Sequence, residues 1–208
     1  MKLLGKEIRT KDGKMLDSII QIIKTYWLAK QIRKGKLPRG RSRKEVIAAI
    51  TDSYTGIMGE IWGVLSVRIY RGETGEWEDG GCISIKKVTT AFRDRIVASL
   101  QNSTTSPLDV FKYHACGTGT TAEANTQTAL VTEVGSRVSG TQATDGNANV
   151  YRTVATITPG NTYAITEHGI LSAASAGVLM DRSVFAAINV GASDSIQFTY
   201  DCTFNAES

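Results

Sequence analysis

Two histidines, three cysteines and one carboxylate beside a histidine are the residues of this chain that could do nucleophilic or metal chemistry. A hydrolase could combine one histidine with a serine or cysteine and a carboxylate. His114 and Cys116 lie two residues apart, and Glu167 directly precedes His168. In a β-strand, Glu167 and His168 would point to opposite faces, while His114 and Cys116 would share one face. The spacing therefore favours structural histidines over a catalytic triad.

The same residue types do not show metal-ligand spacing. The three cysteines are too scattered for a zinc site or a disulfide framework: Cys82, Cys116 and Cys202. The two histidines match no short ligand motif. Three carboxylates fall in or beside different predicted strands, so we expect no calcium site: Asp181, Asp194 and Asp201. We expect no cofactor, and we interpret the thiols as half-buried side chains of a protein assembled in a reducing cytoplasm.

A glycine-rich stretch, residues 117–121 (GTGTT), invites comparison with phosphate-binding loops. It lacks the Lys-Ser/Thr ending of such loops and does not open an apolar helix. We therefore predict an ordinary loop.

A second chemical feature is a run in which seven of twelve residues are basic: Arg33, Lys34, Lys36, Arg39, Arg41, Arg43 and Lys44. Such a density of Lys and Arg suits contacts to nucleic-acid phosphates. It also suits docking on an acidic protein surface, or a solvated loop between two helices. No aromatic residue lies inside the run to stack on bases, which weakens the nucleic-acid interpretation.

The basic run follows a predicted amphipathic helix over residues 15–34. Apolar side chains recur there at helical spacing: Leu16, Ile19, Ile20, Ile23, Trp27 and Leu28. Gly35 and Pro38 end the helix, and the capping box of Ser42 and Glu45 predicts a second helix from about Arg43. The apolar stripe must be buried on another surface. We therefore predict that Leu16, Ile19, Ile23, Trp27 and the seven basic residues bind a partner.

From residue 64 the period changes to that of strands. Residues 64–70 and 82–88 predict a hairpin across a turn at 71–76, and residues 91–100 predict a helix. Six further strands are predicted at 110–116, 128–134, 148–158, 162–171, 179–190 and 195–204. In the last of these, every second residue from Ile196 to Phe204 is apolar. The residues between them, which include Asp201 and Thr203, form a wet face.

These elements predict a mainly β protein, α+β overall. We expect a basic helical N-terminal arm (1–63), a connecting region of hairpin and helix (64–105), and an antiparallel, jelly-roll-like β-sandwich (106–208). The absence of helices between the last six strands argues against an α/β enzyme fold.

Composition divides the chain in the same way. Of 208 residues, 41% are hydrophobic and 21% charged, which supports a folded core. Residues 1–50 carry 14 Lys/Arg against 4 Asp/Glu, whereas residues 51–208 carry 10 against 16. No stretch predicts a membrane span or a secretory leader, so we expect no membrane partner.

Five segments resemble virion structural proteins of tailed bacteriophages. They are 111–124 (FKYHACGTGTTAEA), 128–134 (TALVTEV), 165–174 (ITEHGILSAA), 179–190 (LMDRSVFAAINV) and 194–200 (DSIQFTY). The resemblance spans about residues 88–205; the basic segment 1–63 departs from it. It implies a non-enzymatic structural component of the particle, assembled in the host bacterial cytoplasm.

Three functions follow as expectations. The first is a capsid decoration or cement protein bound to the major capsid protein. The second is a neck, connector or tail protein that forms a ring or a tip, in contact with other virion proteins. The third is a nucleic-acid-binding protein that acts through residues 33–44. For the first two we expect a homo-oligomer, because repeated particle components favour closed symmetry.

Overall fold

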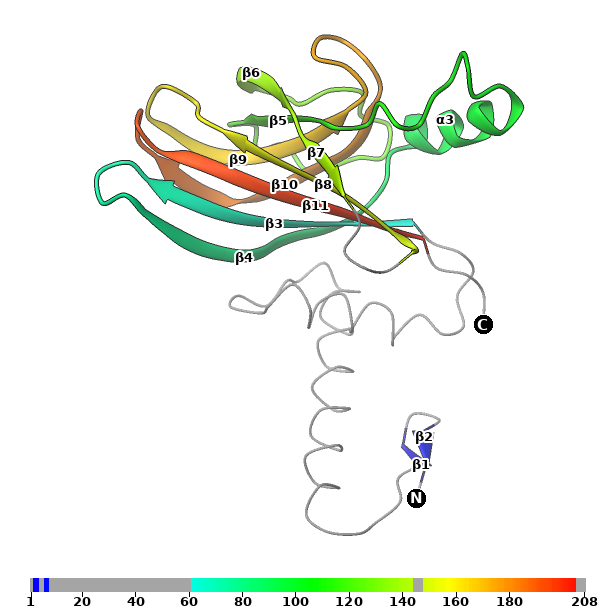
Figure 1. Cartoon of the computed structure of the whole chain (residues 1–208), viewed down its shortest axis with the longest axis horizontal. Coiled ribbons are helices and arrows are strands. Elements are labelled where there is room, and N and C mark those ends of the chain that lie inside the picture. Colours follow the sequence, from blue (N-terminus) through cyan, green and yellow to red (C-terminus); the bar gives the residue numbers. More distant parts are fainter. Residues whose placement is uncertain (1, 4–5, 8–60, 144–147, 205–208) are drawn as a thin grey trace.

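The computed structural model describes residues 2–3, 6–7, 61–143 and 148–204 (Figure 1). The predicted arm, including its two helices and the basic run, lies outside these residues. At the N-terminus, β1 (Lys2–Leu3) pairs antiparallel with β2 (Lys6–Glu7). The other described strands form two antiparallel sheets, and one helix is described beside them.

The first sheet has five strands in the order β4-β3-β11-β8-β7. Its members are β3 (Ile61–Arg71), β4 (Glu76–Lys87), β7 (Thr141–Ala143), β8 (Val150–Ile157) and β11 (Ser195–Phe204). The predicted hairpin is confirmed, because β3 pairs antiparallel with β4. β3 also pairs with β11 along its length. The hairpin that we assigned to a connecting region is therefore an integral part of this sheet.

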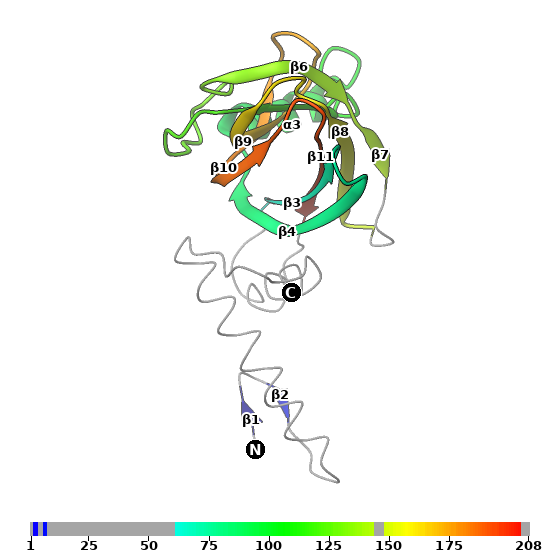
Figure 2. The same ribbon diagram turned by 90° about the vertical axis from the view of Figure 1, so that its left-hand side faces the viewer.

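The second sheet has four strands in the order β10-β9-β5-β6. They are β5 (Tyr113–Gly117), β6 (Glu133–Ser139), β9 (Tyr163–Leu171) and β10 (Leu179–Val190). Viewed from the side, this sheet stacks on the first, with β4 along one surface and β6 at the opposite one (Figure 2). The mainly β, sandwich-like class predicted from the sequence is confirmed.

One predicted strand is wrong. Residues 128–132 form loop rather than strand, and β6 begins only at Glu133. The physical reason is that the amides of Val131 and Thr132 donate to the side chain of Glu167, not to a neighbouring strand. The strand predicted at 110–116 begins three residues later than expected, because β5 starts at Tyr113. Residues 110–112 form a turn instead, in which Lys112 N–H donates to Val110 O.

The helix α3 (Thr90–Gln101) confirms the prediction for residues 91–100 and lies at one end of the sandwich (Figure 1). Thr89 caps it by accepting from Phe92 N–H at 3.2 Å, which satisfies one of the free amides of the first turn. Phe92 is the buried anchor of the helix and meets Phe111 edge-on, with ring centroids 4.9 Å apart.

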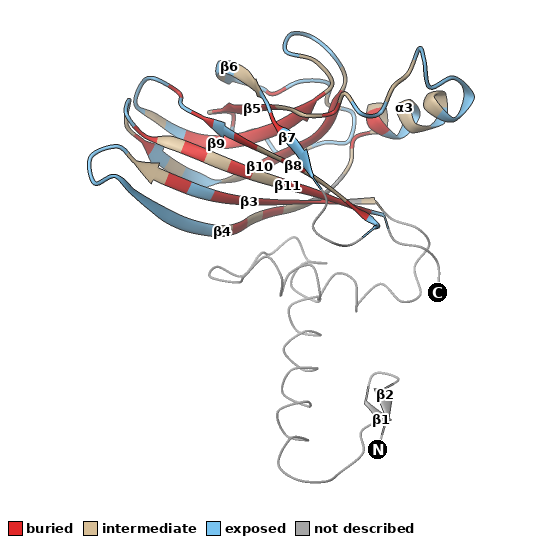
Figure 3. Cartoon of the chain, in the orientation of Figure 1, coloured by how far each residue is buried: buried red, intermediate tan, exposed pale blue. Residues whose placement is uncertain are grey.

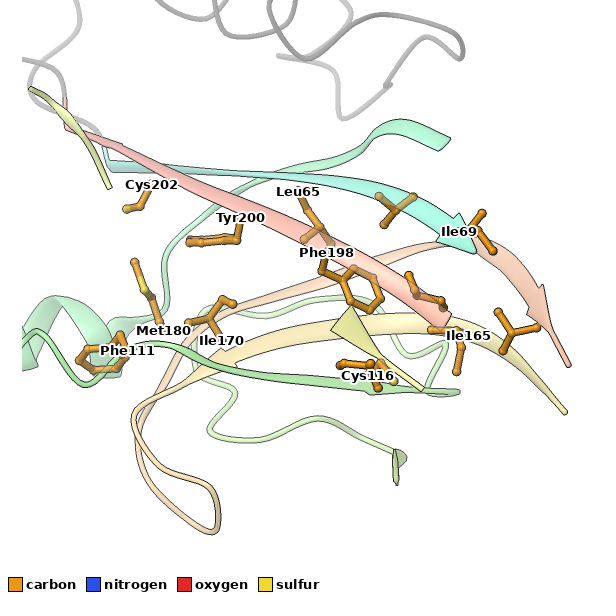
Figure 4. Close-up of a cluster of buried hydrophobic side chains, with 14 of the residues drawn as sticks. Leu65, Ile69, Phe111, Cys116, Ile165, Ile170, Met180, Phe198, Tyr200 and Cys202 are labelled. Atoms are coloured by element: carbon orange, nitrogen blue, oxygen red, sulfur yellow. The ribbon is translucent and has the colours of Figure 1, made fainter. Parts of the chain in front are cut away.

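The core lies between the sheets, and it is built from alternate residues of β3 and β11 together with Ile165, Ile170, Phe111 and Met180 (Figures 3 and 4). Along β11 the predicted buried face holds from Ile196 to Cys202, but the predicted wet face fails at Asp201 and Thr203, which are buried. Asp201 is fully buried because it accepts a hydrogen bond from Arg152 on β8, whereas Phe204 is 40% exposed. A charged side chain can enter the sheet there because its partner enters with it.

Candidate functional site

The two faces of β9 carry the buried polar side chains that the sequence marked as possible chemistry. Glu167 and His168 are adjacent and point to opposite faces, as predicted. His168 faces the core, where its ring lies 4.4 Å from that of Phe198 on β11. Glu167 faces outward, yet it is fully buried beneath the loop at residues 118–132.

On the inner face, the two histidines contact each other. His114 Nδ1 lies 3.0 Å from His168 Nε2, and His114 Nε2 lies 3.1 Å from the hydroxyl of Thr153. Both rings are fully buried. β5 and β9 pair directly, which brings His114 and His168 onto one face of the sheet. Thr153 belongs to β8, so the hydrogen bond between His114 and Thr153 joins the two sheets.

The backbone at residue 140 can lie close to His114 and Thr153 because this residue is a glycine. A Cβ at that position would lie 2.5 Å from the Thr153 hydroxyl oxygen and 2.9 Å from His114 Nε2. Such distances are shorter than real side chains tolerate, so a larger residue would separate His114 from Thr153.

Burial lowers the pKa of His114 to about 3, and it also holds the pKa of His168 well below the ordinary value, where His114 adds to the effect. Both rings are therefore neutral at neutral pH. One of the two contacting nitrogens, His114 Nδ1 or His168 Nε2, carries the proton of their hydrogen bond. If His168 Nε2 donates, His114 can donate onward to Thr153, and only a lone pair on His168 Nδ1 is left without a partner. The opposite arrangement would orphan an N–H at that atom, which costs more.

Cys116 shares the inner face and stands opposite His168 in the ladder of β5 and β9. A nucleophilic thiol needs a lowered pKa so that the thiolate forms. Here burial, together with the charges of Glu133 and Glu167, raises the pKa of Cys116 to about 12. The pair of Cys116 and His168 therefore has the opposite electrostatics to an activated cysteine. All three cysteines are buried thiols that form no disulfide, and they lie deeper than predicted.

On the outer face, Glu167 is the centre of a second network. Its Oε1 accepts from Gly119 N–H at 3.1 Å and Thr132 N–H at 2.7 Å, and its Oε2 accepts from Val131 N–H at 3.1 Å and Arg182 Nε at 2.7 Å. Burial acts to raise the pKa of Glu167, but the amides of Thr132 and Val131 and the Arg182 guanidinium outweigh it and lower the pKa. The carboxylate is therefore ionised and fully occupied.

Arg182 completes the attachment of the loop. Its Nη1 donates to Thr121 O at 3.0 Å and to Gln127 Oε1 at 3.1 Å. The loop also closes on itself, since Thr118 N–H donates to Thr132 O at 2.9 Å. Leu130, a residue of this loop, packs in a small apolar cluster with Ala115 and Leu171 of the sheet. Residues 118–132 therefore form a cover fixed on the outer face of the second sheet.

The glycine-rich stretch at 117–121 belongs to this cover and is a loop, as predicted. The anion that its Gly119 amide binds is the protein's own Glu167. A Cβ at Gly119 would lie 2.5 Å from Glu167 Oε1, so glycine is required for this approach.

The other carboxylates singled out in the sequence are used separately. Asp181 lies on the core face, where Ser183 Oγ donates to it at 3.0 Å. Asp194 accepts from Gly72 N–H, Gly191 N–H and Arg71, and thereby ties the turn after β3 to the turn before β11. Asp201 pairs with Arg152 at 2.8 Å. Among the described residues, no group of three His, Cys, Asp or Glu could hold a metal ion.

The partner-binding residues predicted in the arm lie outside the described residues: Leu16, Ile19, Ile23, Trp27, Arg33, Lys34, Lys36, Arg39, Arg41, Arg43 and Lys44. Sequence reasoning missed both buried networks. A signal for the outer one was present, because Glu167 and Arg182 are opposite charges within two predicted strands. The inner one depends on which strands are neighbours, which no spacing reveals.

Comparisons with protein-family models, with curated proteins and with solved structures gave no match. In the part of the chain that the structure describes, no helix is long and apolar enough to cross a membrane.

Proposed function

We propose that this chain is a non-enzymatic structural component of a tailed-bacteriophage virion, namely a decoration or cement protein on the capsid lattice. The observation that carries the proposal is the position, within the fold, of the segments that resemble such proteins. Segment 111–124 contains His114 and Gly119, segment 165–174 contains Glu167 and His168, and segment 179–190 contains Arg182. The resembling residues are those that join the sheets and fix the cover, so they build a rigid body.

A rigid body of this kind suits a protein that acts by surface complementarity. Its reactive side chains are engaged internally: the imidazoles with each other, and the Glu167 carboxylate with amides and Arg182. The proposal includes the finer architecture expected from the sequence, a jelly-roll-like sandwich with a basic helical arm.

The arm provides the contact with the lattice in this proposal. Residues 1–50 carry 14 basic against 4 acidic residues, while residues 101–208 carry 4 against 9. A basic arm with an apolar stripe would bury the stripe and pair its charges on an acidic surface of the major capsid protein.

Particle incorporation tests this function. Full-length protein and a variant lacking residues 1–50 would each be supplied during assembly, and purified particles would be analysed by quantitative mass spectrometry. We expect the full chain at many copies, on the order of hundreds per particle, and loss of the truncated chain. Thermal unfolding followed by circular dichroism would verify that the truncated body is folded. Normal incorporation of a folded truncated chain would refute the role of the arm.

Copy number also separates the alternatives. Tens of copies or fewer would indicate a neck or tail component instead of a decoration protein. Absence from particles, with DNA binding that weakens steeply as salt rises, would indicate the nucleic-acid function.

A further inference from the structure

Every histidine of the chain lies at one point between the two sheets. The sequence contains two, and they are His114 and His168, in contact at 3.0 Å. Histidine is the side chain whose ordinary pKa puts its charge change between pH 5 and 8. Any response of the side chains to mild acid is therefore concentrated at this contact.

The contact holds the sheets together. His114 on β5 bonds to Thr153 on β8 across the sandwich, and His168 on β9 packs against Phe198 on β11. Both rings are fully buried, and His168 Nδ1 has no hydrogen-bond partner.

The groups that face the pair would not stabilise a positive charge there. On β5, Cys116 is a neutral thiol whose pKa is raised to about 12. On β9, Glu167 points to the other face and is bound by Arg182. On β11, Tyr200 is a phenol whose pKa burial raises further.

The remaining strands contribute two uncharged neighbours and one carboxylate. β6 contributes Val138, which stands opposite His114, and β8 contributes Thr153. On β10, Asp181 faces the core opposite Ile170, where Ser183 donates to it.

A proton added to this pair would create a buried cation without a carboxylate partner, which the folded state resists. In the unfolded chain both imidazoles take up protons near their ordinary pKa of 6.5. Because the pKa of each imidazole is lower in the folded state than in the unfolded state, the unfolded chain binds more protons below pH 6.5. The stability of the fold therefore decreases as the pH falls. The decrease continues until the folded-state pKa of each ring is reached.

We propose that His114, His168 and Thr153 form an acid-sensitive latch between the two sheets, closed at neutral pH and weakened in mild acid. Urea unfolding of the full-length chain between pH 7.5 and 5 tests it. Well below pH 6.5 the equilibrium constant for folding should fall by about tenfold per pH unit for each histidine, hence about a hundredfold for both. The double variant H114Q/H168Q should lose this dependence.

A matched control changes the hydrogen bond without changing the titration. Thr153→Val should be less stable than wild type at every pH and keep the same dependence on pH. Equal pH dependence in the wild type and the double variant would overturn the latch.

If the double variant does not fold, the wild-type chain still decides the question. Nitrogen-15 spectra of the two imidazoles should show both rings neutral from pH 7.5 to 5 in the folded state. Titration of either ring near pH 6.5 in the folded protein would overturn the proposal.

Discussion

Glu167 and Arg182 form an ion pair whose oxygen and nitrogen lie 2.7 Å apart, with side chains that are 0% and 1% exposed. The pair joins neighbouring strands β9 and β10 and at the same time holds the cover of residues 118–132. The pair therefore stabilises the fold more than a surface ion pair would. Glu167 also accepts hydrogen bonds from backbone amides, and Arg182 also donates to a backbone carbonyl.

Replacing Glu167 with Gln should destabilise the protein by about 3 kcal/mol, since Arg182 would remain buried without its counter-charge. Chemical denaturation of the purified chain measures this. The control is Asp94→Asn, because Asp94 pairs with Arg93 at a site where both side chains are more than 60% exposed. That control should change stability by about 0.5 kcal/mol or less. Equal effects of the two substitutions would contradict the structural role of Glu167.

The same pair predicts a dependence on acid. The pKa of Glu167 is lowered from its ordinary value of 4.5. A lowered carboxyl pKa contributes stability that is present above the ordinary value and lost as the pH falls through the folded-state pKa. The difference in stability between wild type and E167Q should therefore be constant from pH 7 to 5 and shrink below pH 4.5. A difference that stays constant down to pH 3 would contradict the lowered pKa.

Gly119→Ala should loosen the cover, because the added methyl would approach Glu167 Oε1 to 2.5 Å. Limited proteolysis should then cleave within residues 118–132 faster than in the wild type, and the melting temperature should fall. Gly191→Ala is the matched control: its methyl would come no closer than 3.8 Å to Asp194, which is ordinary van der Waals contact. Proteolysis of G119A at the wild-type rate would count against a fixed cover.

The two sides of α3 should respond differently to truncation. Phe92 is 4% exposed and packs on Phe111, so Phe92→Ala should cost about 3–5 kcal/mol. Leu100 is 84% exposed, and Leu100→Ser should change stability by about 0.5 kcal/mol or less in the isolated protein. Urea denaturation distinguishes the two. A large cost for L100S would mean that Leu100 is covered in solution.

The three thiols should be inert in the folded protein. Cys82, Cys116 and Cys202 are buried, and burial raises the pKa of Cys116 and of Cys202. A thiol-specific chromogenic disulfide at pH 8 should therefore react with none of them in native protein and with all three in denaturant. Rapid reaction of one thiol in the native protein would contradict its position in the core.

The strands of the body could be predicted because side-chain patterning is local. Alternation in residues 195–204 predicted a strand close to the one observed, since one buried face imposes a period of two, and the β-patterned segments 162–171 and 179–190 also match observed strands. The helix at 90–101 followed from its apolar face in the same way.

The prediction of a strand at 128–134 failed for a reason that no local pattern contains. Its residues have strand propensity, yet Val131 and Thr132 give their amides to Glu167, which lies more than thirty residues further along the chain. Contacts of a distant side chain override propensity whenever they satisfy the backbone equally well.

The sequence alone determined the class of the fold, the absence of a ligand-spaced histidine or cysteine motif, and the opposite directions of Glu167 and His168. Only the tertiary structure decided what those two side chains meet. β5 lies beside β9, so His114 reaches His168; β10 lies on the other side of β9, so Arg182 reaches Glu167. Strand order arises from the packing of whole sheets, and it therefore cannot be read from the spacing of residues within one strand.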